Sequence, residues 1–392
     1  MSIRSTSFKK AHEVLQHQVD EKLLPGVSTA VLKDGQLVDS FCTGFSDIER
    51  GETLRPDHLH RAFSNTKLVT TTLALVLHDE GHFGLDDPIK QWIPEFAQVR
   101  VLRAKASVIT DTEPLQKDIT IRHLLSHQSG LSHGVFDPGT LIYNAYHASG
   151  VRKPDTTLAE MIPKLASLPL VFQPGGGWEY SMATDVLARL IEIITGQSFA
   201  EALQARLFDP LGMVDTAHLL RADQVPRLTT LYRGLDDMQP NLSGLNRLEN
   251  VPWPEAFIKP VPRQAGTSGL ITSQADMVTL LTHITGGQLL KPATLKEMLR
   301  DQISPEHNVQ FFHTGAYPSL GFGFGGAITR ASSTLQPNSP VGEFQWGGLA
   351  GTHWCISPST GVFNVLMAQR YMGFWNPFWF EYKARVYEAI HV

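Results

Sequence analysis

The sequence has few of the features that tie a protein to a membrane, to nucleic acid or to an oxidising compartment. It contains only two cysteines, Cys42 and Cys355, in apolar strand-like runs, so we interpret both as small buried hydrophobic residues and expect no disulfide framework. No stretch approaches the roughly 18–20 apolar residues that a membrane-spanning helix requires. The net charge of -5 gives no reason to expect nucleic acid or an anionic membrane surface as a partner.

The N-terminal segment also lacks the pattern of a signal peptide. Residues 1–18 carry charge and helical spacing, without a central apolar region or a small-residue cleavage site. From the sequence as it stands we expect a cytoplasmic protein. Its 392 residues, 42% hydrophobic and 18% charged, are enough for one large domain or two closely packed domains with a sizeable core.

Strand patterns occur at both ends of the chain, and helical patterns lie between them. Residues 27–32 and 36–42 are β-rich runs joined by a Lys-Asp-Gly turn, which predicts a hairpin. Helical spacing is found at residues 8–19, 68–78, 119–127, 157–168, 183–195 and 377–390, and strand patterns return at 322–329, 342–346, 353–357 and 361–368. Asp87 and Pro88 predict the start of a further short helix, and residues 101–118 a loop or insertion.

This order predicts an α/β fold in which one antiparallel sheet, flanked by helices, is built from both termini. Residues 1–75 and 265–392 would form the sheet domain, and residues 76–264 an inserted, mainly helical domain. Residues 222–264 are rich in Pro, Asn and Gly, which predicts a long surface loop that covers a site between the two domains.

The most informative motif is Ser64-Asn65-Thr66-Lys67, at the head of an apolar helical run. Positions i and i+3 of a helix share a face, so the amine of Lys67 can approach the hydroxyl of Ser64. A serine hydroxyl is a poor nucleophile without a nearby base, and a lysine can supply one if its pKa is depressed. Since serine and lysine are also common on helix surfaces, the motif needs its context before it indicates a catalytic site.

That context is a set of further motifs in a fixed order. Tyr180-Ser181-Met182 and Trp346-Gly347-Gly348 follow the first motif, together with ITIRHLLSHQSGL at 119–131, PGGGWEYS at 174–181 and GLITSQAD at 269–276. Over residues 25–368 the chain resembles the serine β-lactamase and penicillin-binding-protein superfamily. It is most similar to the class C-like branch, which includes class C β-lactamases, D-alanyl-D-alanine peptidases and family VIII carboxylesterases. The resemblance implies the class C β-lactamase-like fold.

The resemblance implies a role for each motif residue. Ser64 would be the acylated nucleophile, and Lys67 with Tyr180 its activating network. We expect Tyr180 to accept the serine proton, with its pKa lowered by the charge of Lys67, although either residue can be the base in this superfamily. The backbone N–H groups of Ser64 and Leu349 would form the oxyanion hole. Gly347 and Gly348 would let the backbone pass close to the substrate.

Two departures from the β-lactamase pattern bear on the substrate. Trp346 and Gly347 replace the Lys-Thr of the third lactamase motif, and Met182 replaces the asparagine of the second. Both changes remove polar anchors for an anionic, amide-bearing substrate and leave an apolar wall. The Trp-Gly-Gly form resembles that of family VIII esterases. His353, close after the third motif, is a further candidate for the pocket lining.

The favoured hypothesis is therefore a serine carboxylesterase of the family VIII type, acting on short or medium acyl esters through a Ser64 acyl-enzyme. The alternatives are a β-lactamase, a D-Ala-D-Ala peptidase, an acyltransferase or amidase with the same intermediate, and a non-catalytic member that only binds a ligand. We expect a small-molecule ester as the only partner and neither cofactor nor metal. The sequence does not predict the oligomeric state.

Three other patterns in the sequence could indicate a different kind of site. Residues 130–134 spell G-x-S-x-G around Ser132, but the nucleophile elbow needs a strand before it, and here a helical pattern precedes. His123 and His127 have a spacing that suits zinc, but no glutamate follows His123 and no third ligand is evident, so we interpret both as packing residues. Residues 321–326 are glycine-rich and are interpreted as a twisted strand, because no lysine or helix follows them.

Overall fold

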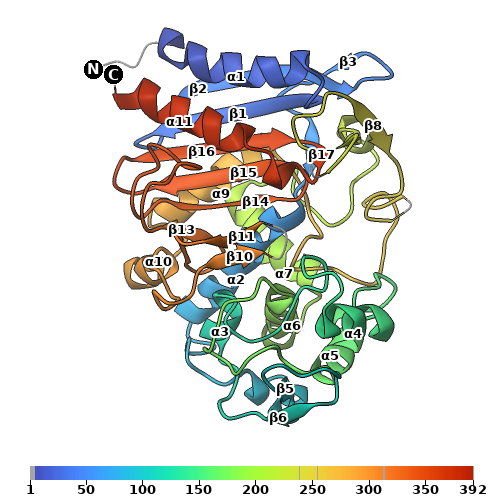
Figure 1. Ribbon diagram of the computed structural model, residues 1–392. Coiled ribbons are helices and arrows are strands. Elements are labelled where there is room, and N and C mark those ends of the chain that lie inside the picture. Colours follow the sequence, from blue (N-terminus) through green and yellow to red (C-terminus); the bar gives the residue numbers. More distant parts are fainter. Residues whose placement is uncertain (1–4, 238, 254, 312–313, 392) are drawn as a thin grey trace.

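The main feature of the computed structural model is an eight-stranded antiparallel sheet (Figure 1). The structure describes residues 5–237, 239–253, 255–311 and 314–391. Strands from the end of the chain lie beside strands from its beginning, in the order β12-β13-β14-β15-β16-β1-β2-β3. Their bounds are β1 Gly26–Lys33, β2 Gln36–Asp47, β3 Glu52–Thr53, β12 Leu320–Phe322, β13 Ala327–Thr329, β14 Phe344–Gly348, β15 Thr352–Ser357 and β16 Val362–Ala368. The predicted antiparallel sheet built from both termini is confirmed.

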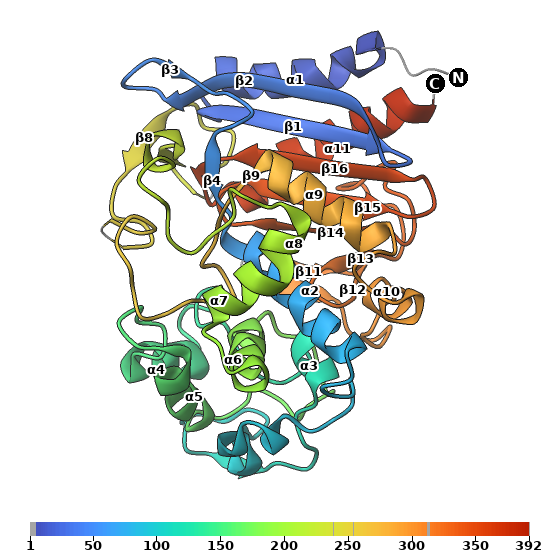
Figure 2. The same ribbon diagram turned by 180° about the vertical axis from the view of Figure 1, so that it is seen from behind.

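Helices cover both faces of this sheet. α1 (Lys9–Asp20) and α11 (Phe378–His391) pack on one face, and α9 (Gln274–Thr285) and α2 (Thr66–Asp79) lie against the other (Figures 1 and 2). β15 and β16 are buried along their whole length, as expected for strands that are covered on both sides. The central pair joins the two ends of the chain, because β1 pairs with β16 from Val27 opposite Ala368 to Lys33 opposite Val362.

The middle of the chain forms a helical region beneath the sheet (Figure 1). Its helices are α3 Ile121–Leu125, α4 Leu141–Ser149, α5 Leu158–Ala166, α6 Ala183–Thr195 and α7 Phe199–Leu203. α6 begins at the residue that the sequence predicted and is buried over most of its first three turns. One continuous hydrophobic core runs from α6 through α2 to the inner face of the sheet. The boundaries at residues 75 and 265 stay a prediction.

Four segments differ in detail from the sequence-based expectation. Residues 222–264 contain β7 (Leu231–Gly234) and β8 (Leu245–Leu248), which form a small sheet with β17 (Arg370–Tyr371). Residues 101–118 include most of the paired strands β5 (Arg100–Leu102) and β6 (Thr112–Pro114). The predicted strand 322–329 is divided by a turn at residues 323–326 between β12 and β13. Asp87 does not cap a helix, because its carboxylate accepts the N–H of Gly84 at 2.6 Å and only a short 3-10 turn, Ile89–Gln91, follows.

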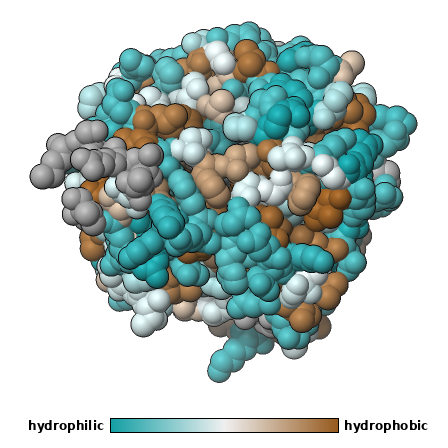
Figure 3. All heavy atoms as spheres, turned by 90° about the horizontal axis from the view of Figure 1, so that it is seen from above, coloured by the Kyte–Doolittle hydropathy of each residue, from teal (hydrophilic) through white to brown (hydrophobic). Residues whose placement is uncertain are grey.

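The surface seen from the side of α1 mixes hydrophilic side chains with scattered hydrophobic ones (Figure 3). Single exposed hydrophobic residues of this kind are normal on a protein surface in contact with water. Within the described residues, no helix has the length and apolar character needed to cross a membrane.

Candidate active site

Ser64 lies in a single 3-10 turn, Phe63–Asn65, that leads directly into α2. The chain reaches this turn through β4 (Leu59–Arg61), which pairs with β9 (Ile271–Ser273). Phe63 has a φ of +43°, a conformation that a non-glycine residue adopts at a cost of roughly 1–3 kcal/mol. Its ring packs edge-on against Tyr371 at 6.4 Å and holds the turn in place. Ser64 therefore sits on a backbone fixed from both sides.

Lys67 is buried one turn further along and contacts Ser64, as the spacing predicted. Its side chain is 1% exposed, and Nζ lies 3.3 Å from Oγ of Ser64 while donating to the carbonyl of Thr267 at 3.0 Å. Burial lowers the pKa of Lys67 to about 7, and the negative charge of Asp185 opposes that shift. A substantial fraction of the amine is thus uncharged near neutral pH and able to accept the proton of Ser64.

Tyr180 lies in the loop before α6, and its hydroxyl is held by Trp346. Nε1 of Trp346 donates to this hydroxyl at 3.1 Å. Burial raises the pKa of Tyr180 well above its ordinary value, and hydrogen bonding with Ser64 and Trp346 offsets only part of that rise. The expectation that the charge of Lys67 lowers this pKa is wrong, because desolvation of a phenolate dominates in so buried a position. Of the two residues, Lys67 has the pKa of a base and Tyr180 that of a proton donor.

Two buried histidines pack against the Tyr180 ring. His127 lies 4.9 Å away between ring centroids and hydrogen-bonds through Nδ1 to the hydroxyl of Ser181 at 2.8 Å. His133 stacks on the Tyr180 ring at 5.4 Å. Burial lowers the pKa of both histidines well below the ordinary value, so they are neutral near pH 7. The two imidazole rings therefore hold the ring of Tyr180 in place and add no positive charge to the site.

The zinc alternative has no support from the placement of His123. Its Nδ1 accepts the N–H of Thr120 at 3.2 Å and completes a capping box at the start of α3. Over the described parts of the chain, no three His, Cys, Asp or Glu side chains gather in a way that could hold a metal ion.

The residues predicted for the oxyanion hole come together around Ser64. Leu349 follows the last residue of β14 and lines the same cavity as Ser64, Phe136, Tyr180, Phe311, Trp346, Gly347 and Phe374. Among the described residues, the backbone N–H groups of Ser64 and Leu349 donate no hydrogen bond. Free N–H groups at the edge of a cavity are suited to bind a developing oxyanion.

The two glycines of the third motif have no room for a side chain. A Cβ on Gly348 would lie 2.3 Å from the carbonyl oxygen of Ala62, and one on Gly347 would lie 2.5 Å from Nδ1 of His353. Both distances are far below van der Waals contact. The close packing of β14 against the chain before Ser64 and against β15 therefore requires both glycines, and the expected close approach of a substrate stays a prediction.

Two predicted pocket residues lie away from the cavity at Ser64. His353 faces α11, where its ring stacks on Trp379 at 4.8 Å, because alternate residues of a strand point to opposite faces of the sheet. Met182 is buried at the start of α6 and forms part of the core. Neither lines the cavity that contains Ser64.

Ser132, the serine of the G-x-S-x-G pattern, lies in a loop, and no described histidine or lysine is hydrogen-bonded to its hydroxyl. Its hydroxyl contacts two acidic groups, Asp137 Oδ2 and Glu179 Oε1, each at 3.3 Å. The preceding element is α3, not a strand. The strand-turn-helix setting of a nucleophile elbow is absent here.

The sequence analysis missed the aromatic residues that close the cavity. Phe136, Phe311 and Phe374 line it together with Trp346. Phe311 ends β10 (Val309–Phe311), which pairs with β11 (Gly315–Tyr317). These three residues come from separate loops and strands, and no shared motif marks them. Only their aromatic character, in a chain with 20 phenylalanines, could have been noted.

The chain is similar to known proteins over nearly its whole length. A family model described as Beta-lactamase matches residues 11–374. Esterase EstB of Burkholderia gladioli is 29% identical over 388 residues, covering 95% of this chain and 93% of that protein. Lovastatin esterase of Penicillium rubens is 30% identical over 376 residues, or 88% of either chain.

A solved structure extends the comparison to the fold. EstCE1, described as a hydrolase with promiscuous acyltransferase activity, matches with a TM-score of 0.84 and 23% identity, and the match covers 99% of both chains. At this level of identity the likeness concerns the fold alone. The predicted α/β fold with an antiparallel sheet is confirmed by this match.

Proposed function

The chain belongs to the Beta-lactamase family, and on that premise we propose that it is a serine hydrolase that cleaves neutral carboxylic esters through an acyl-enzyme on Ser64. The observation that carries the proposal is the contact of Ser64 Oγ with the buried amine of Lys67, 3.3 Å away, whose pKa is about 7. A nucleophile needs a base that is uncharged at the working pH and within reach, and Lys67 meets both requirements.

In the proposed acylation step, uncharged Lys67 takes the proton of Ser64 as Oγ attacks the ester carbonyl. The carbonyl oxygen becomes an oxyanion between the backbone N–H groups of Ser64 and Leu349. Collapse of this intermediate breaks the bond to the alcohol. The departing alkoxide takes the proton of the Tyr180 hydroxyl. Tyr180 then regains a proton from the ammonium of Lys67 through water, since the amine lies over the tyrosine ring and is not hydrogen-bonded to its oxygen.

Deacylation repeats these steps with water as the nucleophile. Lys67, uncharged again, takes a proton from water as its oxygen attacks the acyl-enzyme. The same two N–H groups hold the second oxyanion. As the acid leaves, the ammonium of Lys67 gives this proton to Oγ of Ser64, 3.3 Å away, so the hydroxyl of Ser64 is restored and no group is consumed.

The lining of the cavity favours a neutral ester over a β-lactam. Its side chains are mainly aromatic, and no lysine or arginine is among the described residues that line it. The carboxylate of a β-lactam would lose its hydration there without gaining a partner, which costs several kcal/mol in a poorly solvated site. An ester without charge has no such penalty. The alternatives of a β-lactamase and a D-Ala-D-Ala peptidase are therefore disfavoured.

Covalent labelling tests this proposal directly. After reaction with a fluorophosphonate, we expect mass spectrometry to place the adduct on Ser64, no adduct in Ser64→Ala, and normal labelling in the exposed-site control Ser304→Ala. An adduct on Ser132 with Ser64 unmodified would overturn the mechanism.

Turnover of p-nitrophenyl acetate, p-nitrophenyl octanoate and a chromogenic cephalosporin then tests the substrate class. Efficient cephalosporin turnover with negligible ester cleavage would contradict the ester assignment.

Acyl transfer to an alcohol is a second candidate function. A cavity of about 600 Å³ opens beside Tyr180, which is far more room than a water molecule needs. An alcohol held there could replace water in deacylation, with the same proton transfers. Addition of an alcohol to the ester assay, with the transesterified product measured by mass spectrometry, tests this function.

A further inference from the structure

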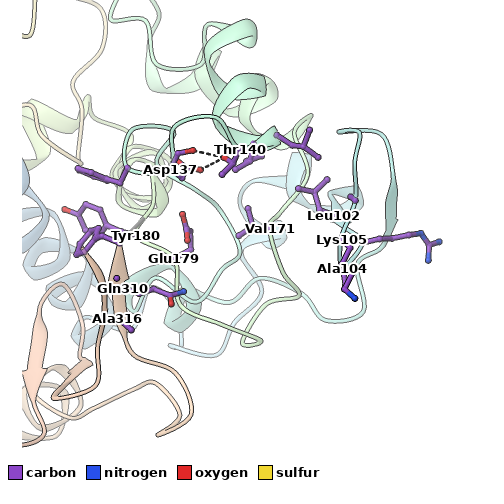
Figure 4. Close-up of a pocket in the computed structure, with 17 residues that line it drawn as sticks. Leu102, Ala104, Lys105, Asp137, Thr140, Val171, Glu179, Tyr180, Gln310 and Ala316 are labelled. Carbon is purple, nitrogen blue, oxygen red and sulfur yellow. Dashed lines mark hydrogen bonds between the residues drawn. The ribbon is translucent and has the colours of Figure 1, made fainter. Parts of the chain in front are cut away.

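The cavity beside Tyr180 is next to the cavity at Ser64. Phe136, Tyr180 and Phe311 line both spaces, so the two are neighbours across the same aromatic wall. Away from Tyr180 the larger cavity runs toward the β5 region, where Figure 4 shows Leu102 and Lys105 at the far end. Much of its lining is apolar and comes from Leu102, Ala104, Leu141, Ile142 and Val171. A carbon chain bound there would bury apolar surface.

A cluster of two acidic side chains lies directly next to the catalytic tyrosine, and the other polar side chains of the lining include Arg103, Lys105 and Gln310. The cluster consists of Asp137 and Glu179, which lie near each other at the Tyr180 end of the cavity (Figure 4). The hydroxyl of Ser132 contacts both carboxyl groups at 3.3 Å, and the hydroxyl of Thr140 contacts Asp137 Oδ2 at 3.0 Å. These hydrogen bonds from Ser132 and Thr140 fix the orientation of the two acidic side chains.

The cluster still has unused hydrogen-bonding capacity. Glu179 Oε2 has no hydrogen-bond partner among the described residues, and Asp137 Oδ1 is buried without one. Burial and the charge of Asp137 raise the pKa of Glu179 to about 8. A buried carboxyl oxygen without a partner is unfavourable, and a ligand that donates a hydrogen bond would relieve it.

We propose that Asp137 and Glu179 form a specificity subsite for the alcohol part of the ester, and that they bind a hydroxyl or ammonium group on that alcohol. The inference rests on the proposed ester hydrolysis and names its substrate class: esters of an alcohol with an apolar body and a second, hydrogen-bond-donating group.

The position of Tyr180 decides which part of the ester enters this subsite. In the proposed mechanism its hydroxyl protonates the departing alcohol, so the alcohol must pass beside it. Glu179 is the preceding residue in the chain and lines the cavity on that side. The acyl group stays bonded to Ser64 and needs no contact with the two carboxyl groups.

A matched series of substrates tests the proposal on the wild-type protein. The series is butyl, hexyl and octyl acetate with their terminal hydroxy and terminal ammonio analogues, measured as kcat/KM. A hydrogen bond to a charged group predicts that at one chain length a donor-bearing ester is preferred by roughly ten- to a hundredfold. Ratios close to one at every length would overturn the proposal.

The same series separates the two donors. Preference for the ammonio over the hydroxy ester, weakened by salt or by Asp137→Asn, would assign an ammonium ligand. Equal preference for both, unchanged by salt, would assign a hydroxyl ligand. Either result supports the subsite, since both need the acceptor oxygens of the carboxyl pair.

Two variants then link the preference to the cluster. Glu179→Leu, of similar size but without acceptor oxygens, should reduce the donor-to-alkyl ratio toward one, and Asp137→Asn gives a second measurement if the first variant folds poorly. The control Glu306→Gln, at an exposed position, should keep the wild-type ratio. An unchanged ratio in both cavity variants would contradict the assignment. Failure of the proposed function is distinguishable, since wild-type protein would then cleave none of the alkyl acetates.

Discussion

The amine of Lys67 lies over the face of the Tyr180 ring, 4.4 Å from its centroid. In this position a charged amine is attracted to the ring but is not hydrogen-bonded to the phenolic oxygen. The same buried surroundings lower the pKa of Lys67 to about 7 and raise that of Tyr180. Environments that move two pKa values in opposite directions separate the roles of base and acid.

The first prediction concerns the dependence of activity on pH. If uncharged Lys67 is the base, kcat/KM for an ester without titratable groups should rise with pH and level off above an inflection near 7. His127 and His133 cannot cause this inflection, since burial holds their pKa values well below the ordinary one. Initial rates across the range with p-nitrophenyl acetate provide the measurement. A flat profile would remove Lys67 as the base.

A second prediction concerns stability. Lys67 is charged in both the folded and the unfolded state below pH 7, and between pH 7 and its ordinary pKa of 10.5 only the unfolded chain keeps the proton. The free energy of unfolding of the wild type should therefore rise with pH in this window. Lys67→Met should be inactive and more stable, by a margin that shrinks by up to roughly 1.4 kcal/mol per pH unit above pH 7.

Urea unfolding at several pH values gives this margin, and Lys383→Met is the contrasting control. Lys383 is equally buried but is paired with Glu343 at 2.5 Å. Its removal leaves the buried carboxylate of Glu343 without its cationic partner, although the hydroxyl of Tyr387 still donates to it, and should destabilise the protein. If Lys67→Met also destabilised the protein at acidic pH, burial of the charged amine of Lys67 would not cost the stability that its lowered pKa implies.

Tyr180→Phe should lower kcat by roughly 10²–10⁴-fold, the usual contribution of a positioned proton donor. The variant keeps the ring that contacts Lys67, so its melting temperature should change little. Tyr382→Phe serves as the control, since Tyr382 is a fully buried residue of α11 whose hydroxyl donates to Asn364 at 3.4 Å, away from Ser64. Wild-type turnover in Tyr180→Phe would exclude its hydroxyl from the mechanism.

Trp346→Phe tests the hydrogen bond that orients Tyr180. Loss of the indole N–H removes the 3.1 Å contact while an aromatic ring is kept, and we expect kcat to fall by about tenfold with KM nearly constant. The control is Trp354→Phe on the neighbouring strand, where the indole N–H is buried without a hydrogen-bond partner. That variant should lose stability through the smaller ring and retain kcat. Equal losses of kcat in both would show that Trp346 acts through packing alone.

Gly348→Ala should nearly abolish activity. The added Cβ would meet the carbonyl of Ala62 at 2.3 Å and displace the turn that carries Ser64 or the end of β14 that carries Leu349. Separation of the two oxyanion donors is expected to cost about 10²–10³-fold in kcat. Gly35→Ala is the control, because Gly35 has a φ of +77° with open space around it, so it should lose about 1 kcal/mol of stability and no activity. Comparable kcat losses in both variants would contradict this account.

Local patterns were enough to predict the elements that position Ser64. The Asp-Gly turn between β1 and β2 and the start of α6 follow from turn chemistry and helical periodicity, which act over a few residues. Asp87 shows the limit of such rules, because a carboxylate that can cap a helix can also bind a nearby loop N–H, here that of Gly84. Which contact forms depends on the packing of the whole segment.

The sequence by itself determined which residues carry the chemistry: Ser64, Lys67 and Tyr180 stand in motifs whose spacing and order indicate a nucleophile and its activating groups. Only the tertiary structure decided their protonation, because a pKa depends on how completely the surrounding elements exclude water and on which charges remain near. The tertiary structure also decided where two further side chains lie. His353 points toward α11 because alternate residues of a strand face opposite sides of the sheet, and Glu179 lines a cavity only because distant loops close around it.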